Sequence, residues 1–170
     1  FNRTDVAAKL MFQKSFPSWL YPVIQGATTI WERWNSIQPD GSIIDGMNSF
    51  NHYSYGAIGD WLYRSAVGIC EAAPGFKKII IRPHPGGGFT GMQASTLTPY
   101  GKVAAKWTAE DDVLKTLVVE IPVNTTAEVF VPAQSAEVVK NEEGLNPVGT
   151  EEGYVRFVAG SGKYVFRIEQ

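Results

Sequence analysis

The chain has 170 residues, 44% of them hydrophobic and 19% charged, and a formal net charge of −2, which is typical of a globular protein and excludes a disordered one. Because basic residues are not clustered and no apolar run reaches membrane-spanning length, we expect neither a nucleic-acid nor a membrane partner. Cys70 is the single cysteine and can form neither an internal disulfide nor a metal site by itself, so no metal and no cofactor is expected. The chain begins at Phe1 without a signal-peptide pattern, and we interpret it as a piece of a longer protein whose compartment stays unknown, with the cytoplasm slightly favoured.

Two helices are expected in the first part of the chain. Residues 3–14 place Val6 and Leu10 on one face, with Thr4 as the N-cap and Pro17 as the stop. Residues 51–69 repeat apolar positions at spacings of three and four, which predicts a second helix with one buried face, formed by Ala57, Ile58, Trp61 and Leu62.

The second part of the chain predicts an antiparallel β-sandwich. Pro74 and Gly75 break the helical pattern, so we expect a domain boundary that leaves residues 1–72 in one domain and 73–170 in the next. Apolar residues then alternate in short segments separated by Gly, Pro, Asn and acidic turns. The expected strands lie within residues 77–83, 90–99, 101–107, 113–123, 126–133, 136–141, 154–160 and 162–170.

The first part does not look complete by itself. It holds four of the five tryptophans in about 70 residues, and a segment of that size buries little apolar surface alone. We therefore expect its apolar faces to meet a partner outside this sequence.

Glu32 is the most informative candidate for chemistry, because it lies between Trp31 and Trp34 in "GATTIWERWNS". In an extended segment Glu32 and Arg33 point to opposite faces and do not pair, and Trp31 and Trp34 do not share a face either. Sugars stack their C–H faces on indoles and bond their hydroxyls to carboxylates. The residues alone leave two interpretations open, which are a catalytic carboxylate in a sugar pocket and a structural ion pair.

The two histidines do not form a metal site. His52 lies at an expected helix start, where Asn48, Ser49 and Asn51 are good caps, and it is either a capping residue or a substrate hydrogen-bonding group. His84 lies in the loop "RPHPGGG" and is interpreted as structural or exposed.

Three motifs together resemble the closing section of bacterial α-L-rhamnosidases, glycoside hydrolase family 78. They are "GATTIWERW", "MNSFNHYSYGAIGDWLYRSAVGI" and "PGFKKIIIRPHPGGG", and the later "TPYGKVAAKW" and "LVVEIPVNTTAEVFVPA" are similar to the C-terminal β-sandwich of that family. The similarity runs in order through nearly the whole chain, and the T-x-W-E-x-W and N-H-Y motifs are its specific parts.

The resemblance implies a fold and a chemistry. It implies that residues 1–72 are the last helices of an (α/α)6 barrel and that the whole enzyme cleaves terminal α-L-rhamnose from glycosides with inversion. Glu32 falls on the general base of the family. His52 falls on a residue that contacts the sugar, Asn51 of the same motif is assigned with it to substrate binding, and Trp31 and Trp34 are expected to shape the pocket.

The chain departs from the family pattern in two places. The general acid lies in an earlier part of the barrel and matches nothing in these residues, so we expect the isolated chain to be inactive. Asn35 and Ser36 follow Trp34 where the family often has Asp-Gly. Two alternatives stay open, which are an (α/α)-barrel hydrolase or lyase for another sugar and a non-catalytic carbohydrate-binding or scaffold sandwich. The second is disfavoured because Trp107 is the only tryptophan of that part.

Overall fold

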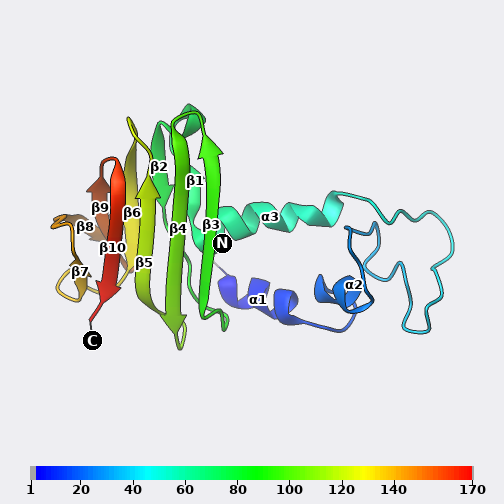
Figure 1. Ribbon diagram of the computed structural model, residues 1–170. Helices are drawn as coiled ribbons and strands as arrows, with labels where there is room; N and C mark the ends of the chain where they lie inside the picture. The colour runs from blue at the N-terminus through cyan, green and yellow to red at the C-terminus, as the bar shows by residue number, and fades with distance from the viewer. Residues whose placement is uncertain (1–2, 170) are drawn as a thin grey trace. The chain divides into compact units, whose positions relative to one another are not determined.

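Alternating apolar residues in the C-terminal part build two five-stranded sheets in the computed structural model, which describes residues 3–169 (Figure 1). The strand orders are β1-β2-β6-β9-β8 and β3-β4-β5-β10-β7. The strands are β1 (Ile69–Glu71), β2 (Lys78–Ile81), β3 (Gly91–Thr98), β4 (Gly101–Glu110), β5 (Val113–Ile121), β6 (Thr126–Pro132), β7 (Val139–Asn141), β8 (Pro147–Glu151), β9 (Tyr154–Ala159) and β10 (Gly162–Ile168).

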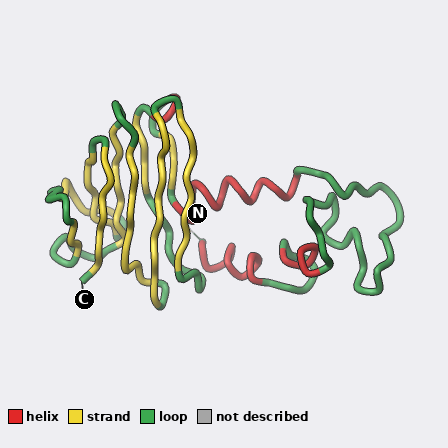
Figure 2. The backbone as a smooth tube through the Cα atoms, viewed as in Figure 1, coloured by secondary structure: helices red, strands yellow, loops and turns green. Residues whose placement is uncertain are grey.

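The chain divides into two units at residue 60. We call residues 3–60 the aromatic unit and residues 61–169 the sandwich unit. Figure 2 shows that strands dominate the sandwich unit, whereas helices and long loops make up the aromatic unit.

The two sheets bury one shared core, which confirms the predicted β-sandwich. Phe157 of β9 and Phe166 of β10 belong to different sheets, and their ring centroids are 5.0 Å apart. Leu117 and Val119 on β5 are fully buried, as their alternation predicts. Such burial contributes roughly 1.5–3 kcal/mol for each large side chain and stabilises the sandwich from within.

The prediction of a purely antiparallel sandwich is wrong at one pair. Strands β2 and β6 are parallel, with Lys78 opposite Thr126 and Ile81 opposite Val129, while the other strand pairs within residues 3–169 are antiparallel. A parallel pair needs a long connection. Here β3, β4 and β5 of the other sheet supply it, so local sequence patterns could not reveal the pairing.

The sequence also missed two strands. β1 follows almost directly after a helical segment and has three residues, so the prediction ended the helix at Ile69 and assigned the rest of "ICE" to the join between the domains. β8 contains Pro147 and Gly149, is exposed along its whole length and lies at a sheet edge. Pro and Gly within a short segment argue against a strand, except at an edge.

The helical segment that ends at Val67 is joined to the first strand through a close backbone contact at Gly68. Its φ is +89°, and a Cβ there would lie 2.2 Å from the carbonyl carbon of Arg82, so no other residue fits without rearrangement. Just before it, the buried Trp107 indole N–H donates to the carbonyl of Ala66 at 2.9 Å. These two contacts fix the start of β1 against β2 and β4.

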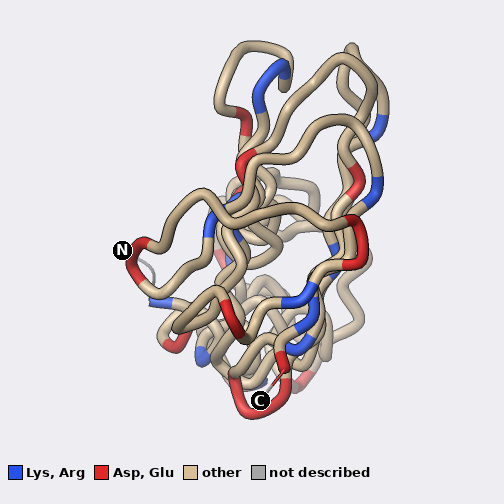
Figure 3. Tube along the Cα trace, turned by 90° about the vertical axis from the view of Figure 1, so that its left-hand side faces the viewer, with Lys and Arg blue, Asp and Glu red and all other residues tan. Residues whose placement is uncertain are grey.

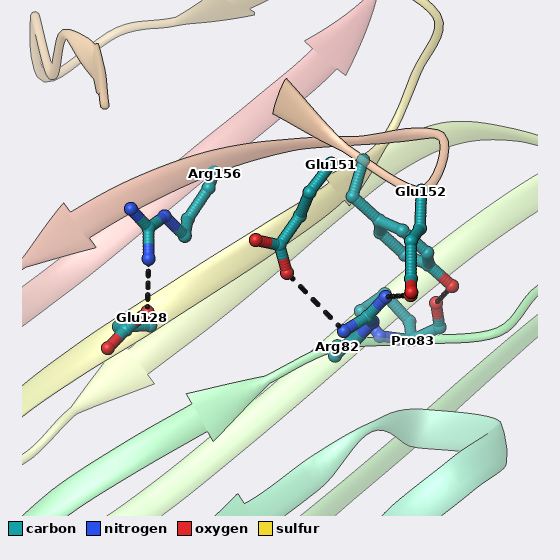
Figure 4. A network of polar contacts seen from close by, with 7 residues as sticks. Arg82, Pro83, Glu128, Glu151, Glu152 and Arg156 are labelled. Atoms are coloured by element: carbon teal, nitrogen blue, oxygen red, sulfur yellow. Dashed lines mark hydrogen bonds and ion pairs between the residues drawn. The ribbon is translucent and has the colours of Figure 1, made fainter. Parts of the chain in front are cut away.

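Arg82 organises a polar cluster at the end of β2 (Figure 4). Its guanidinium lies 4.5 Å from the ring centroid of Tyr154 and 4.9 Å from that of Phe130. It donates to Glu152 at 2.7 Å and forms a longer ion pair with Glu151 at 3.7 Å. Stacking on two aromatic rings and pairing with carboxylates hold this arginine in place at the end of β2.

His84 packs beside the same cluster. It is half-buried, its Nδ1 lies 3.0 Å from the carbonyl oxygen of Ser65, and its ring packs edge-on against Tyr154 with centroids 5.9 Å apart. Burial lowers the pKa of the His84 imidazole, and the positive charge of Arg82 lowers it further. The interpretation of His84 as structural is therefore supported by its contacts.

Several charged residues of the sandwich unit form opposite-sign pairs. Figure 3 shows basic and acidic positions interspersed along the chain. Arg156 pairs with Glu128 at 3.2 Å, and Lys102 pairs with Glu120 at 2.9 Å across neighbouring strands. Exposed pairs of this kind contribute about 0–1 kcal/mol each.

The aromatic unit contains short helices and irregular loops. The predicted first helix is α1 (Thr4–Phe12), but it begins at Thr4 itself, so Thr4 is not its N-cap, and Val6 is half exposed. A helix that the sequence did not reveal, α2 (Leu20–Ile24), follows. The predicted second helix starts at Ser54 with η1 (Ser54–Ala57) and α3 (Ile58–Trp61) and continues into the sandwich unit as the π-helical η2 (Leu62–Val67). The sandwich unit also contains the short η3 (Pro74–Phe76). Within residues 3–169 no helix is long and apolar enough to cross a membrane.

Candidate active site

The loop that carries Glu32 begins where α2 ends. Gly26 adopts φ +87° and its N–H bonds to the carbonyl of Val23, which turns the chain out of the helix. Thr28, Thr29 and Ile30 follow, and their β-branched side chains favour an extended backbone.

Two segments distant in sequence are joined at this loop. The backbone N–H of Glu32 donates to the carbonyl of Ser49 at 2.8 Å, and the N–H of His52 donates to the carbonyl of Ile30, also at 2.8 Å. The Thr29 hydroxyl adds a hydrogen bond to the carbonyl of Phe50. The backbone therefore brings the segment of Glu32 and the segment of His52 next to one another, although no hydrogen bond joins the two side chains within the described residues.

Glu32 does not pair with Arg33. The guanidinium of Arg33 instead donates to the carbonyl oxygen of Asp45 at 3.4 Å. Within residues 3–169 the half-buried Glu32 carboxylate takes part in no ion pair and no hydrogen bond. The structure thus lacks the ion pair of the alternative interpretation, and the carboxylate is left with its acceptor positions free.

The two tryptophans beside Glu32 are fixed by other aromatic rings. Trp31 is 4% exposed and packs edge-on against Phe50, with ring centroids 5.6 Å apart. Trp34 stacks on Tyr55 at 4.5 Å and meets Trp19 edge-on at 5.5 Å. This aromatic packing holds both ends of the W-E-R-W segment.

Trp31 and Trp34 line one apolar cavity of about 280 Å³, so the expectation that they do not share a face is wrong. The chain turns after Arg33, where the N–H of Ser36 bonds to the Arg33 carbonyl. This turn places the indole of Trp34 at the same cavity as the indole of Trp31. Neither Glu32 nor His52 lines this cavity. The cavity walls are formed by Trp19, Pro22, Val23, Ala27, Thr28, Thr29, Ile30, Trp31, Trp34 and Tyr55.

One ring nitrogen of His52 is occupied by a hydrogen bond. Its Nδ1 accepts the backbone N–H of Ser54 at 3.2 Å, and its ring stacks on the exposed Tyr53 with centroids 5.5 Å apart. In the neutral imidazole an accepting Nδ1 places the proton on Nε2, which is then a donor. Asn51 is exposed, and its backbone N–H bonds to the Ser49 hydroxyl.

The predicted helix caps have other roles. The helical segment begins at Ser54, and His52 rather than Asn48, Ser49 or Asn51 accepts its first free N–H. Asn48 instead contacts the hydroxyl of Ser36 at 2.6 Å. Sequence reasoning missed the contact between Ser36 and Asn48 because it depends on how the loop folds back.

Within residues 3–169 no group of three or more His, Cys, Asp or Glu side chains is placed to hold a metal ion.

Two family profiles match consecutive parts of the chain. The "bacterial alpha-L-rhamnosidase 6 hairpin glycosidase domain" matches residues 1–66, and the "bacterial alpha-L-rhamnosidase C-terminal domain" matches residues 68–146.

Similar proteins carry the same name. An α-L-rhamnosidase of Streptomyces avermitilis is 43% identical over 98% of this chain, and one of Formosa agariphila is 41% identical over 96%. The chain spans only 16% and 18% of their lengths. The crystal structure of the S. avermitilis enzyme complexed with L-rhamnose matches with a TM-score of 0.88 at 42% identity, covering 98% of this chain and 16% of that one. The native enzyme of Aspergillus terreus matches with a TM-score of 0.81 at 35% identity, covering 97% and 17%.

Proposed function

Because the chain belongs to the bacterial α-L-rhamnosidases, we propose that it is the C-terminal part of an inverting glycoside hydrolase that releases terminal α-L-rhamnose and that Glu32 is its general base. The aromatic unit then contributes the last helices of an (α/α)6 barrel, and the sandwich unit follows as a separate domain. The substrates are rhamnose-containing glycosides, and the remainder of the barrel is the structural partner.

The observation that carries this proposal is the state of the Glu32 carboxylate. It is half-buried and free of ion pairs within the described residues, and its backbone is hydrogen bonded to Ser49. A general base needs an unpaired oxygen that can take a proton from water, on a backbone that does not move. A structural ion-pair residue would need its partner, and Arg33 bonds elsewhere.

The reaction divides the work between two carboxyl groups. In inverting enzymes they stand roughly 6.5–9.5 Å apart, so that a water fits between the base and the anomeric carbon. Glu32 takes a proton from that water while the water oxygen attacks and the bond to the leaving oxygen breaks. The general acid that protonates the leaving oxygen comes from an earlier part of the barrel, so the isolated chain is inactive.

The other predicted residues have supporting roles in this proposal. His52 offers its Nε2–H to a sugar hydroxyl, since Nδ1 is engaged by Ser54. Asn51 is exposed and can bond a hydroxyl beside it. Trp31 and Trp34 shape the site indirectly, because their own aromatic contacts hold the loop that carries Glu32.

The non-catalytic alternative for the sandwich unit cannot rest on the single tryptophan of that unit's β part. Trp107 is 1% exposed and donates its N–H inside the domain, so it cannot stack on a sugar. We therefore assign the sandwich unit a structural role.

The stereochemistry of the product tests this function. Proton NMR of full-length protein with an aryl α-L-rhamnoside is expected to show β-L-rhamnose first, before it equilibrates. First appearance of the α-anomer would contradict inversion and the role of Glu32 as base. No cleavage of the rhamnoside, with cleavage of another glycoside, would favour a barrel enzyme for a different sugar.

A further inference from the structure

Ser36 is completely buried at the turn that follows Glu32. Its hydroxyl lies 2.8 Å from the carbonyl oxygen of Arg33 and 2.6 Å from Oδ1 of Asn48. Its backbone N–H also bonds to the Arg33 carbonyl, and its own carbonyl accepts the N–H of Ile44. Ser36 thus contacts three separate points of the loop, two through its hydroxyl and one through its backbone carbonyl.

The contact between Ser36 and Asn48 closes a hydrogen-bonded ring, and Glu32 is one of its members. Asn48 directly precedes Ser49, whose carbonyl accepts the Glu32 N–H at 2.8 Å. Residues 32–36 and residues 48–49 are therefore joined at both ends. Since the Glu32 carboxylate has no side-chain partner within residues 3–169, this backbone ring determines where it points.

Removing the Ser36 hydroxyl would open the ring. Nδ2 of Asn48 is already buried without a partner in the described part of the chain, so the loss of the Oδ1 contact would leave the whole amide unsatisfied. A buried polar group without a partner destabilises the arrangement that buries it, and here that arrangement is the loop behind Glu32.

We propose that Ser36, acting through Asn48, is a positioning residue for Glu32. This inference rests on the proposed role of Glu32 as general base. Ser36 touches no substrate, and its effect on turnover arises because a small displacement of a catalytic group slows the reaction strongly, by as much as about 100-fold for 1 Å.

A double-mutant comparison in the full-length protein tests the inference. Ser36→Ala is expected to lower kcat on an aryl α-L-rhamnoside by about 10- to 100-fold. In a Glu32→Gln background, the same Ser36→Ala change is expected to leave the residual kcat unaltered, because the base that it positions is absent.

Two further variants protect the test from a folding failure. Asn48→Ala removes the partner of Ser36 at a less buried position, is expected to lower kcat like Ser36→Ala, and carries the test if Ser36→Ala does not fold. Ser18→Ala is the matched control, since Ser18 is equally buried and accepts the N–H of Tyr21 at 3.1 Å in α2. It should lower the melting temperature but not kcat.

The outcomes separate the two proposals. Normal turnover of Ser36→Ala and Asn48→Ala beside an impaired Glu32→Gln would overturn the positioning role alone. An equal loss from Ser36→Ala in the presence and absence of the base would also overturn it, since the effect would then be structural. Normal turnover of Glu32→Gln would overturn the base itself, and with it this inference.

Discussion

The sandwich unit and the aromatic unit bury apolar surface to different degrees. The sandwich unit encloses its largest apolar side chains, such as Trp107, Phe157 and Phe166, between its own sheets. The aromatic unit leaves many of its apolar side chains exposed, namely Val6, Phe12, Phe16, Val23, Ile24, Ile30, Ile43, Met47 and Tyr53. From this comparison we expect the sandwich unit to fold by itself, whereas the aromatic unit alone buries too little apolar surface to do so.

Separate expression of the two units is expected to give the largest difference. Residues 61–170 should unfold in one cooperative thermal transition, because their core lies within the unit. Residues 1–60 should show no cooperative transition, because they bury too little apolar surface. Circular dichroism during heating measures both. A sharp transition for residues 1–60 alone would contradict the comparison.

A single core substitution sharpens the comparison within the sandwich unit. Phe157→Ala should lower the free energy of unfolding by about 3–5 kcal/mol, because it removes a ring packed on Phe166 and leaves a cavity. Val158→Ala is the matched control, since Val158 follows on the same strand and is 51% exposed, and its effect should stay within about 0.5 kcal/mol. Urea titration measures both values, and equal effects would argue against a shared core.

The smallest expected effect is the pH dependence from His84. Its folded pKa is lowered by burial, so below about 6.5 the unfolded chain binds a proton that the folded chain does not. Stability should therefore be complete above pH 6.5 and fall as the pH drops from there towards the folded pKa.

Urea midpoints of the 170-residue chain between pH 7.5 and 5.5 measure this dependence. His84→Gln should remove the decline, whereas His52→Gln should leave it unchanged, because the side-chain contacts of His52 are to Ser54 and Tyr53 in the aromatic unit. A decline that persists in His84→Gln would assign it to other groups.

Most of the sandwich could be predicted because its signal is local. Alternation in segments such as Leu117 to Ile121 identified the strands, and Gly and Asn marked the turns. The parallel pairing of β2 with β6 could not be predicted, since it depends on strands of the other sheet. The exposed edge strand β8 carries no alternation that a sequence could show.

The candidate site was predicted less completely. The W-E-R-W motif singled out Glu32 as a candidate, and Glu32 does not pair with Arg33, whose guanidinium bonds to the carbonyl of Asp45. The shared cavity of Trp31 and Trp34 and the contact between Ser36 and Asn48 both depend on the turn after Arg33. Contacts that a loop makes by folding back on itself leave no periodic pattern in the sequence.

The central claim, that Glu32 is the general base, is tested most directly by the turnover of Glu32→Gln in the full-length protein on an aryl α-L-rhamnoside. Asp45→Asn makes the same chemical change at an exposed carboxylate of the same unit and is the matched control. The account predicts that kcat falls by about 10²- to 10⁴-fold for Glu32→Gln, with the protein still folded, and stays normal for Asp45→Asn. Near-normal turnover of Glu32→Gln would contradict it.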